Sequence, residues 1–315
     1  AYRGACLMSI LPIDHGIFAS SAVSGAAAAG YFGGGDTASG EVTTVDKFLF
    51  SDDSRTTLGT GLSDARQYLA ANASSVAGYF GGGASAFTDA VDRFLFSDDS
   101  RTILSTGLSG PRAYLAANAS SVAGYFGGGY DTGEAATTAT VNRFLFSDDS
   151  RTTLSSGLSV ARYYLAGMAS PVAGYFGGGN TSATTVDRFL FSDDSRTTLG
   201  TGLSGNSRQL AGMASSVAGY FGGGSNYPTW LTTVDRFLFS NDSRTTLGTG
   251  LSVGTAGLAG MASSVAGYFG GGENVSEVKL TKVDRFLFSD DSRTILGTGL
   301  SAANENLAAM ANLGA

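Results

Sequence analysis

Short runs of alternating hydrophobic and polar residues fill the chain, and the pattern predicts strands. In residues 45–50 the apolar side chains of Val45, Phe48, Leu49 and Phe50 are typical of a pleated strand buried largely on both faces. The following Ser-Asp-Asp-Ser, residues 51–54, predicts a turn, because Asp and Ser side chains hydrogen-bond the local backbone. The β-branched run that follows, residues 56–60, predicts the return strand of a hairpin.

A second strand pair precedes this hairpin in each unit of the pattern. In the next unit, residues 69–73 and 76–80 are two apolar runs joined through Ser74-Ser75, and their small side chains let a neighbouring backbone approach closely. Each unit of about 45–50 residues therefore contains four short strands. That length and strand number are those of one blade of a β-propeller.

Six copies of this unit follow one another. The block VDRFLFSDDSRT recurs with few changes, and a second block, AGYFGGG, stands between its copies. The number of residues from each repeat valine to the glycine of the next Gly-Tyr-Phe is constant, as from Val45 to Gly78. The number of residues from that glycine to the following repeat valine varies. One loop, between GGG and the next valine, therefore absorbs the differences in length. The repeat valines are Val45, Val91, Val141, Val186, Val234 and Val283, and the glycines are Gly30, Gly78, Gly124, Gly174, Gly219 and Gly267.

The two ends of the repeat region complement each other. The first repeat begins at AGYFGGG, in the middle of a unit, and the last ends with residues 307–312, which match the strand that precedes AGYFGGG elsewhere. Pairing them would remove the open sheet edges that a solenoid would leave unpaired at its two ends. We therefore expect an all-β, six-bladed propeller over residues 26–315, with four antiparallel strands per blade and the seam in the first blade. Residues 21–29 are the alternative partner strand, but they match the repeat less well.

The repeat resembles the kelch motif. A glycine doublet follows Tyr79-Phe80, a variable loop leads to a strand that ends in an aromatic residue and an Asp turn, and an arginine stands at the blade boundary. The motif's tryptophan is replaced by Leu58 and its equivalents, and the last two repeats lack the arginine. The turn at residues 51–57 also resembles the Asp-box of sialidase propellers. Repeats of this uniformity are similar to those of structural proteins of bacteriophages, cyanophages especially. The boundary arginines are Arg66, Arg112, Arg162 and Arg208.

Composition fits a large all-β domain and limits its partners. The chain of 315 residues is 43% hydrophobic and 14% charged, and its 47 glycines suit many tight turns. A net charge of -7 argues against nucleic acid as a partner. Most cationic residues occupy fixed repeat positions, so we expect them to pair with the repeated Asp residues rather than to meet a ligand.

Residues 1–25 belong to no repeat. Their apolar run, residues 5–13, is too short to span a bilayer and is followed by Asp14-His15-Gly16, so we expect neither membrane insertion nor a secretory signal. We expect this N-terminal arm to dock on the propeller or on a neighbouring protein. Cys6 and His15, the single cysteine and histidine, both lie in it, and we expect them to be packed residues.

An inventory of reactive residues argues against catalysis. Copper-radical or Ser-His-Asp chemistry would depend on His15 alone, and the glutamates have no repeated context for a sialidase-like site. We therefore expect no enzyme, no cofactor and no metal site. Two alternatives stay open. Abundant Asp would allow paired carboxylates for glycoside hydrolysis, and each Ser-Asp-Asp-Ser turn could offer two ligands to calcium, although one turn supplies too few oxygens.

Strand parity predicts that all positions that differ between repeats lie on one face. The turns at Ser74-Ser75 and at residues 51–54 are expected on one side, and the loop after GGG and the segment after Gly-Leu-Ser on the other. Loops on a rigid scaffold are where binding sites concentrate, although unconstrained drift would give the same pattern. Trp230, the single tryptophan, could bind a ligand or pack against a neighbouring blade. The candidate binding residues are Tyr68, Tyr114, Tyr130, Arg162, Tyr163, Tyr227 and Trp230.

The resemblance to phage proteins implies a virion or extracellular protein without catalytic activity. Our first hypothesis is a tail or capsid appendage that contacts glycan or protein on the host surface. The second is an architectural component held to other virion proteins by the N-terminal arm. A lectin-like propeller and a glycan-cleaving enzyme are further alternatives. Near-identical repeats also allow blades to exchange between chains, which would give homo-oligomers.

Overall fold

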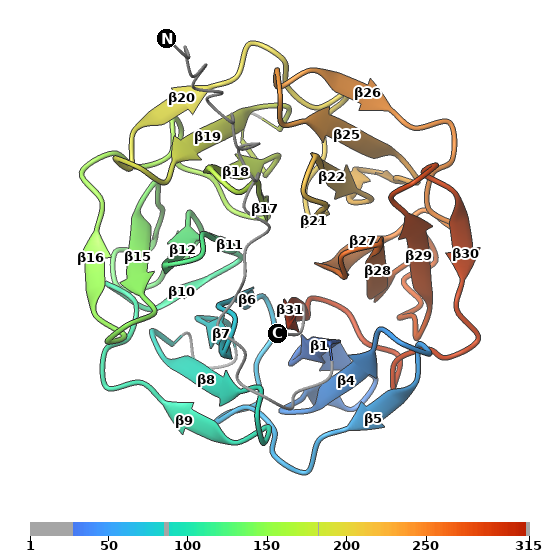
Figure 1. Ribbon diagram of the computed structural model, residues 1–315, viewed down its shortest axis with the longest axis horizontal. Coiled ribbons are helices and arrows are strands. Elements are labelled where there is room, and N and C mark those ends of the chain that lie inside the picture. The colour runs from blue at the N-terminus through green and yellow to red at the C-terminus, as the bar shows by residue number, and fades with distance from the viewer. Residues whose placement is uncertain (1–27, 85–87, 182, 313–315) are drawn as a thin grey trace, which may run out of the picture.

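Six four-stranded antiparallel sheets make up most of the protein. The computed structural model describes residues 28–84, 88–181 and 183–312, and the regular structure in these residues consists of β-strands without a helix. Figure 1 shows the sheets around a common axis, each with its strands following one another from the axis to the rim. The expectation of an all-β chain built from four-stranded antiparallel sheets is therefore confirmed.

The inner half of each sheet consists of the strand beside the axis and the strand paired with it (Figure 1). The second strand carries the AGYFG residues, and in β7 and its equivalents all five of these residues are buried. The innermost strands are β6 (Ala70–Ala73), β11 (Ala116–Ala119), β17 (Ala166–Ala169), β21 (Ala211–Ala214), β27 (Ala256–Ala262) and β31 (Ala308–Asn312). The second strands are β1 (Ala29–Gly33), β7 (Ala77–Gly81), β12 (Ala123–Gly127), β18 (Ala173–Gly177), β22 (Ala218–Gly222) and β28 (Ala266–Glu273).

The outer half of each sheet is the predicted hairpin. Its second strand is shorter than the β-branched run suggested, since it begins at the arginine and ends after three residues. The third strands are β4 (Val45–Leu49), β8 (Val91–Leu95), β15 (Val141–Leu145), β19 (Val186–Leu190), β25 (Val234–Leu238) and β29 (Val283–Leu287). The outermost strands are β5 (Arg55–Thr57), β9 (Arg101–Ile103), β16 (Arg151–Thr153), β20 (Arg196–Thr198), β26 (Arg244–Thr246) and β30 (Arg293–Ile295).

The last described strand completes the first sheet. β31 pairs with β1 in antiparallel register, from Ala29 opposite Asn312 to Gly33 opposite Ala308, and the sheet order is β31-β1-β4-β5. The expected pairing of the C-terminal strand is thus present. Most of the alternative partner, residues 21–27, lies outside the described residues. So does the N-terminal arm, residues 1–25, with Cys6 and His15.

The hydrophobic core is divided among the joints between neighbouring sheets. At one joint Tyr79 and Val91 of one sheet pack with Phe126 and Phe144 of the next. Six clusters of this kind are found, and each combines two neighbouring sheets. The last links the sheet of β27 to β30 back to Phe32 of β1. Apolar burial therefore continues around the whole ring of sheets.

The invariant glycines of AGYFGGG let the sheets approach closely. A Cβ atom at Gly78 would overlap the Met310 sulfur of the neighbouring sheet. At Gly81, a Cβ atom would lie 2.7 Å from the ring of Phe126 in the next sheet. Every repeat shows the same two contacts, with Met or Asn against the first glycine and Phe against the second. A larger residue at the first position would require the neighbouring Met or Asn side chain to shift, and at the second position it would press against the neighbouring Phe ring.

Polar contacts tie the joints together at the hairpin turns. The Tyr79 hydroxyl donates to Asp149 Oδ1 of the next sheet at 3.0 Å, and Arg93 lies 3.6 Å from the other carboxylate oxygen. All six joints repeat this arrangement, and Tyr268 closes the cycle by donating to Asp53. The predicted pairing with repeated Asp residues is therefore confirmed for these six cations. For the arginines that begin the outermost strands, ion pairs with Asp are found at Arg55, Arg101 and Arg196.

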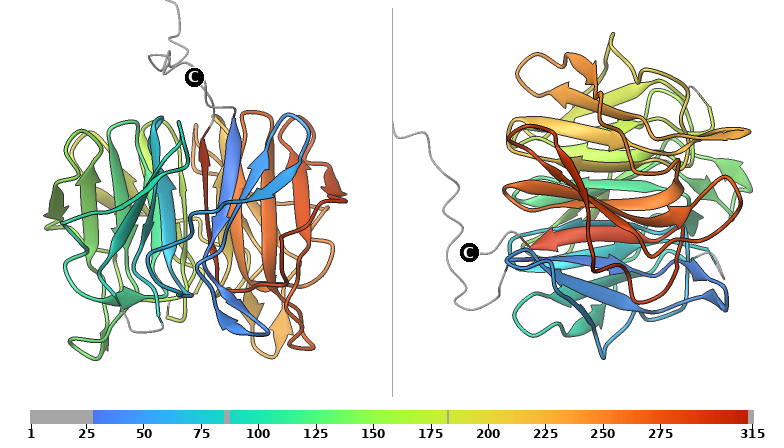
Figure 2. Two further views of the ribbon diagram at one scale, coloured as in Figure 1. Left: turned by 90° about the horizontal axis from the view of Figure 1, so that it is seen from below. Right: turned by 90° about the vertical axis from the view of Figure 1, so that its right-hand side faces the viewer.

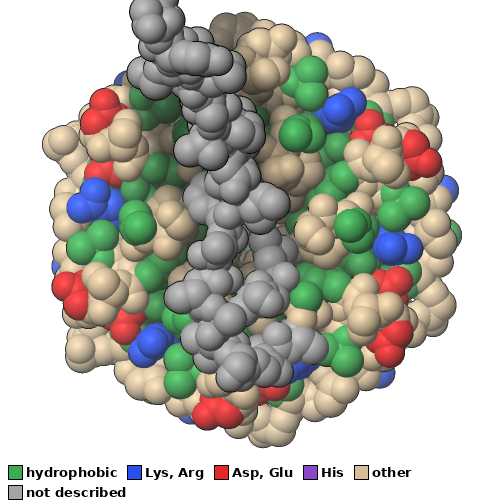
Figure 3. All heavy atoms as spheres, viewed as in Figure 1, with side chains coloured by type: hydrophobic (Ala, Val, Ile, Leu, Met, Phe, Trp, Pro, Cys, Tyr) green, Lys and Arg blue, Asp and Glu red, His purple; other side chains and the backbone are tan. Residues whose placement is uncertain are grey.

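Two faces follow from the strand directions. The Phe96 N–H donates to the Val76 carbonyl, which places the Asp turn beside the Ser74-Ser75 turn on what we call the constant face (Figure 3). The Arg112 N–H donates to the Thr88 carbonyl on the opposite side, the variable face. The predicted separation of faces is thus confirmed. Short strands that the sequence did not predict extend from the variable face (Figure 2): β2 (Asp36–Thr37), β3 (Gly40–Glu41), β10 (Arg112–Ala113), β13 (Tyr130–Asp131), β14 (Ala136–Thr137), β23 (Ser225–Asn226) and β24 (Thr229–Trp230).

Candidate functional site

A ring of six residues surrounds the axis on the variable face, and we call it the axial ring. Each member stands directly before the leucine that leads into an innermost strand, and each has a positive φ, such as 60° at Tyr114. The Tyr114 N–H donates to the Tyr68 carbonyl at 2.8 Å, and the same bond links every successive pair until Tyr68 donates to Asn306 at 2.7 Å. The members are Tyr68, Tyr114, Tyr164, Gln209, Gly257 and Asn306.

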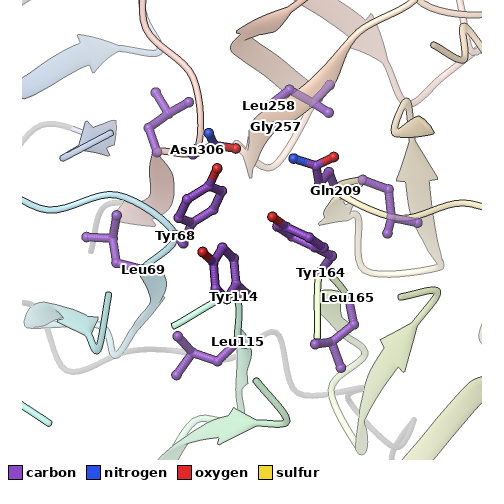
Figure 4. Close-up of a pocket in the computed structure, with 12 residues that line it drawn as sticks. Tyr68, Leu69, Tyr114, Leu115, Tyr164, Leu165, Gln209, Gly257, Leu258 and Asn306 are labelled. Atoms are coloured by element: carbon purple, nitrogen blue, oxygen red, sulfur yellow. The ribbon is translucent and has the colours of Figure 1, made fainter. Parts of the chain in front are cut away.

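One half of the axial ring is aromatic. The ring centroids of Tyr68 and Tyr114 are 4.1 Å apart, and those of Tyr114 and Tyr164 are 4.6 Å apart. Tyr163 extends this group, 4.9 Å from Tyr164, and Tyr130 lies 6.3 Å from Tyr163. Figure 4 shows the three ring tyrosines side by side, facing the amides of Gln209 and Asn306 across the axis. The site therefore combines contiguous aromatic surface with neutral hydrogen-bonding groups.

The axial ring encloses a small cavity of about 60 Å³, which the leucine after each member also lines. Burial raises the pKa of Tyr164 to about 12 and also raises the pKa values of Tyr68 and Tyr114. The hydroxyls therefore stay protonated at neutral pH and can donate hydrogen bonds as well as accept them. Nothing charged belongs to the ring, so it suits a neutral polar ligand with apolar faces, such as a sugar.

The structure brings together four of the predicted binding residues. Tyr68, Tyr114, Tyr163 and Tyr130 form one connected group. Tyr164 and Gln209 end two of the segments that vary between repeats, but the sequence did not single them out. Gly257 and Asn306 were missed. Their position directly before the repeat Leu-Ala was the available signal, and it was hidden because the tyrosine of the first three cases is not kept in the other three.

Arg162, another of the predicted binding residues, lies inside the fold and pairs with a buried carboxylate. It is fully buried, and its Nη1 lies 3.0 Å from Asp187 Oδ2. The assignment of Arg208 as a boundary arginine is wrong. The boundary position lies three residues before the repeat leucine, and in the first three cases it is occupied by Arg66, Arg112 and Arg162. In the fourth case this position is the buried Ser207. Arg208 is the next residue and is only half-buried.

Tyr227 and Trp230 lie apart from the axial ring, on the hairpin of β23 and β24. Tyr227 is 73% exposed, Trp230 is half-buried, and their ring centroids are 6.4 Å apart. The Trp230 backbone packs closely against Gly254, where a Cβ atom would overlap the Trp230 carbonyl. The choice between packing and ligand binding for the indole stays a prediction.

In the turns that read Ser-Asp-Asp-Ser, the two carboxylates have separate partners. Asp98 Oδ1 accepts the Ser100 N–H within its own turn, whereas Asp99 accepts the Tyr31 hydroxyl and pairs with Lys47 at 2.8 Å.

Within residues 28–84, 88–181 and 183–312, no three His, Cys, Asp or Glu side chains gather as a metal site would require. The same residues include no helix that is long and apolar enough to cross a membrane.

No protein-family model matches the chain, and no curated protein matches it. The resemblance to kelch repeats and to phage structural proteins therefore stays a prediction from the residues.

Proposed function

We propose that the chain is a six-bladed kelch-like β-propeller and serves, without catalysis, as an interaction module of a bacteriophage virion, in a tail or capsid appendage. Its axial ring binds glycan on the host surface. The cyclic order of sheets, of core clusters and of axial hydrogen bonds supports the propeller. The aromatic half of the axial ring is the observation that carries the binding function.

Differences between the repeats support this choice of face. The constant face repeats the same turns, and its Tyr, Arg and Asp side chains are engaged between sheets. The axial ring has no need of tyrosine for folding, because Gln209, Gly257 and Asn306 occupy equivalent positions with similar backbone angles. Three tyrosines there add half-buried aromatic surface beyond what the fold requires. Aromatic side chains are the residues that most often anchor a ligand.

Co-sedimentation with host cells tests the proposal. The purified protein is mixed with intact candidate hosts, with and without periodate treatment of the cell surface. We expect binding that periodate abolishes, since periodate cleaves vicinal diols of glycans. Binding that survives periodate points to a surface protein instead, and absence of binding to every candidate host contradicts the proposal. Release of soluble sugar from the cells would establish the alternative of a glycan-cleaving enzyme.

Substitutions that the fold already accepts identify the site. In the variant with Tyr68→Gln, Tyr114→Gln and Tyr164→Gln, each new residue matches Gln209 in position. We expect at least a tenfold loss of cell binding with little change in melting temperature. Tyr227→Ala, on the separate exposed hairpin, is the matched control and should bind as the parent does. The opposite result for these two variants would move the site to the hairpin.

A second candidate function, architectural docking, is favoured by one observation on the constant face. The valine before the AGYFG strand is exposed in successive repeats, with fractions of 62% at Val122, 65% at Val172, 60% at Val217 and 59% at Val265. A circle of exposed apolar residues suits contact with another protein. The corresponding test replaces these four valines with threonine. We expect loss of incorporation into particles and unchanged binding to cells, whereas normal incorporation would remove this candidate.

A further inference from the structure

A buried carboxylate recurs at one position of the third strand in nearly every sheet. Where the boundary residue is arginine, its guanidinium holds this carboxylate. Arg66 Nη2 lies 2.8 Å from Asp92 Oδ2, and the second case, Arg162 with Asp187, has a distance of 3.0 Å. All four side chains are almost completely buried. These sites show how the fold accommodates a guanidinium ion.

The carboxylate of Asp235 lacks that guanidinium. Ser207 stands at the boundary position, and Asp235 is 3% exposed. Its Oδ2 accepts the Ser204 N–H at 2.7 Å, just as Asp92 Oδ2 accepts the Ser63 N–H. No cation lies within ion-pair distance of Asp235 among the described residues. A buried carboxylate without a counter-ion is costly, so this site favours a cation.

A cavity occupies the place of the missing side chain. It has a volume of about 210 Å³ and is lined by Asp235, Ser207, Phe221 and Thr233. Exposed residues, including Asn206, lie along its edge, so the cavity opens to the variable face.

The cavity wall also carries the carbonyl groups that arginines use in other sheets. The Phe176 carbonyl accepts from Arg162 Nη2 at 3.0 Å, and the Thr140 carbonyl accepts from Arg112 Nη1 at 3.0 Å. Phe221 and Thr233 are the repeat equivalents of these two residues and line the cavity. A planar cation with several N–H donors matches a carboxylate flanked by carbonyls better than a compact ammonium does.

In the other sheets that lack a boundary arginine, a different cation lies beside the buried carboxylate. Beside Asp284 the boundary residue is Thr255, and Lys282 supplies the cation at 2.9 Å. Beside Asp46 there is a second cavity, of about 240 Å³, but Arg55 already lies 3.5 Å from that carboxylate. Asp235 is thus the strongest candidate for a cation from outside.

We propose that the cavity beside Asp235 binds a guanidinium group from outside the chain, either of a small guanidinium compound or of an arginine side chain. The guanidinium pairs with Asp235 and donates to the carbonyls of Phe221 and Thr233. This inference goes beyond the proposed host-binding function and does not depend on it.

Calorimetric titration of the full chain with methylguanidinium chloride tests the site, at millimolar concentrations far below those that unfold proteins. We expect saturable binding that is at least tenfold tighter than that of methylammonium. Ser207→Arg should abolish it, because the new side chain fills the cavity, and should raise the melting temperature. Gly200→Arg adds the same charge at an exposed position with open space around it, and should leave binding unchanged.

Asp235→Asn provides a second variant in case Ser207→Arg does not fold. The fold accepts this exchange, because Asn142 already occupies the equivalent position, and the variant should lose methylguanidinium binding. A blocked Gly-Arg-Gly peptide distinguishes the sources, since tighter binding than methylguanidinium indicates an arginine side chain and weaker binding a small compound. Absence of saturable binding to the parent protein, or equal binding by Asp235→Asn, would overturn the proposal.

Discussion

At the scale of single residues, the buried polar positions of the third strands decide how each sheet is held. Asp92 forms ion pairs with two arginines, Arg66 at 2.8 Å and Arg101 of the outermost strand at 3.2 Å. The same position in the third repeat is Asn142. Its boundary residue, Arg112, is fully buried and donates to the Asn142 amide oxygen and to the carbonyls of Gly128 and Thr140. Arg112 is therefore a buried cation held by neutral groups.

Asn142→Asp should stabilise the protein. Burial lowers the pKa of Arg112 to about 10, so it is still charged at neutral pH and lacks a carboxylate partner at hydrogen-bond distance. We expect the new carboxylate to raise the free energy of unfolding by about 1–3 kcal/mol, the range for hydrogen bonds to charged groups. Urea unfolding at pH 7 measures this. In the Arg112→Met background the same substitution should instead destabilise, because the buried charge would then be unpaired.

The gain from Asn142→Asp should disappear in acid. At the equivalent Asp187, burial disfavours the ionised form, but the Ser159 N–H and Arg162 outweigh it and hold the pKa below the ordinary value. A carboxyl whose pKa is lowered on folding contributes stability above its unfolded pKa and loses it as the pH falls through its folded pKa. Unfolding midpoints of variant and parent should therefore converge below about pH 4. A gain that persists unchanged at pH 2 would contradict the ionic explanation.

At the scale of elements, the spacing of the innermost strands depends on glycine in half of the ring. A Cβ atom at Gly167 of β17 would overlap the Ala117 carbonyl, and one at Gly212 of β21 would overlap the Gly167 carbonyl. The neighbouring atoms are backbone, so they cannot move aside as a side chain would. The opposite half carries Ala71 and Ala309 at the equivalent positions. The strands thus approach more closely where the repeats have Gly-Met than where they have Ala-Asn or Ala-Met.

Gly212→Ala should therefore destabilise the protein, although alanine generally favours folding over glycine. We expect a loss of about 1–3 kcal/mol, as for other overpacked sites, which exceeds the gain of up to 1 kcal/mol from reduced chain entropy. Chemical denaturation measures the difference. Gly200→Ala, where nothing lies within 4 Å of the new Cβ, is the control and should be neutral or slightly stabilising. Equal effects of the two substitutions would show that the strand spacing is adaptable.

The strands and turns were predictable from the sequence because they depend on local patterns of residues. The axial ring depends instead on contacts between residues of different repeats. Alternation and turn residues predicted strands close to β4 and β7, and fixed spacing predicted their order. The buried state of Asp92 could not be foreseen, because it depends on Arg66 being folded onto it. The axial ring was only partly predictable for the same reason. Tyr68 and Asn306 are far apart in sequence, and only the cyclic arrangement makes them neighbours.

At the scale of the whole molecule, one short strand joins the last repeat to the first. β31 covers the edge of β1, and its Ala308 and Met310 enter the hydrophobic cluster that also contains Tyr31 and Phe80. Burial of a methionine side chain alone contributes about 1.5–3 kcal/mol. The first sheet takes part in two joints, because Ala309 and Ala311 of β31 also pack against the cluster that it forms with the sheet of β27 to β30. The other four joints connect sheets whose own strands are continuous in sequence. The two joints that depend on β31 are therefore where the ring should open most easily.

Ending the chain after Asn306 should expose the edge of β1 and make the protein associate. Free strand edges pair with other chains, and the near-identical repeats offer several matching strands. We expect sedimentation velocity to show concentration-dependent oligomers, and the melting temperature to fall. A synthetic peptide of residues 303–312, added in trans, should restore the sedimentation behaviour of the full chain by adding the missing strand.

The peptide with Met310→Asp separates strand addition from an unspecific effect of peptide. Its backbone can pair with β1, but its carboxylate would be buried against Gly78, where the methionine sulfur packs in the intact chain. It should therefore fail to restore the sedimentation behaviour of the full chain. If the shortened chain sedimented and melted as the full chain does, the ring would be held by the other joints alone. In that case β31 would contribute little to closure, and blade exchange between chains would need another opening.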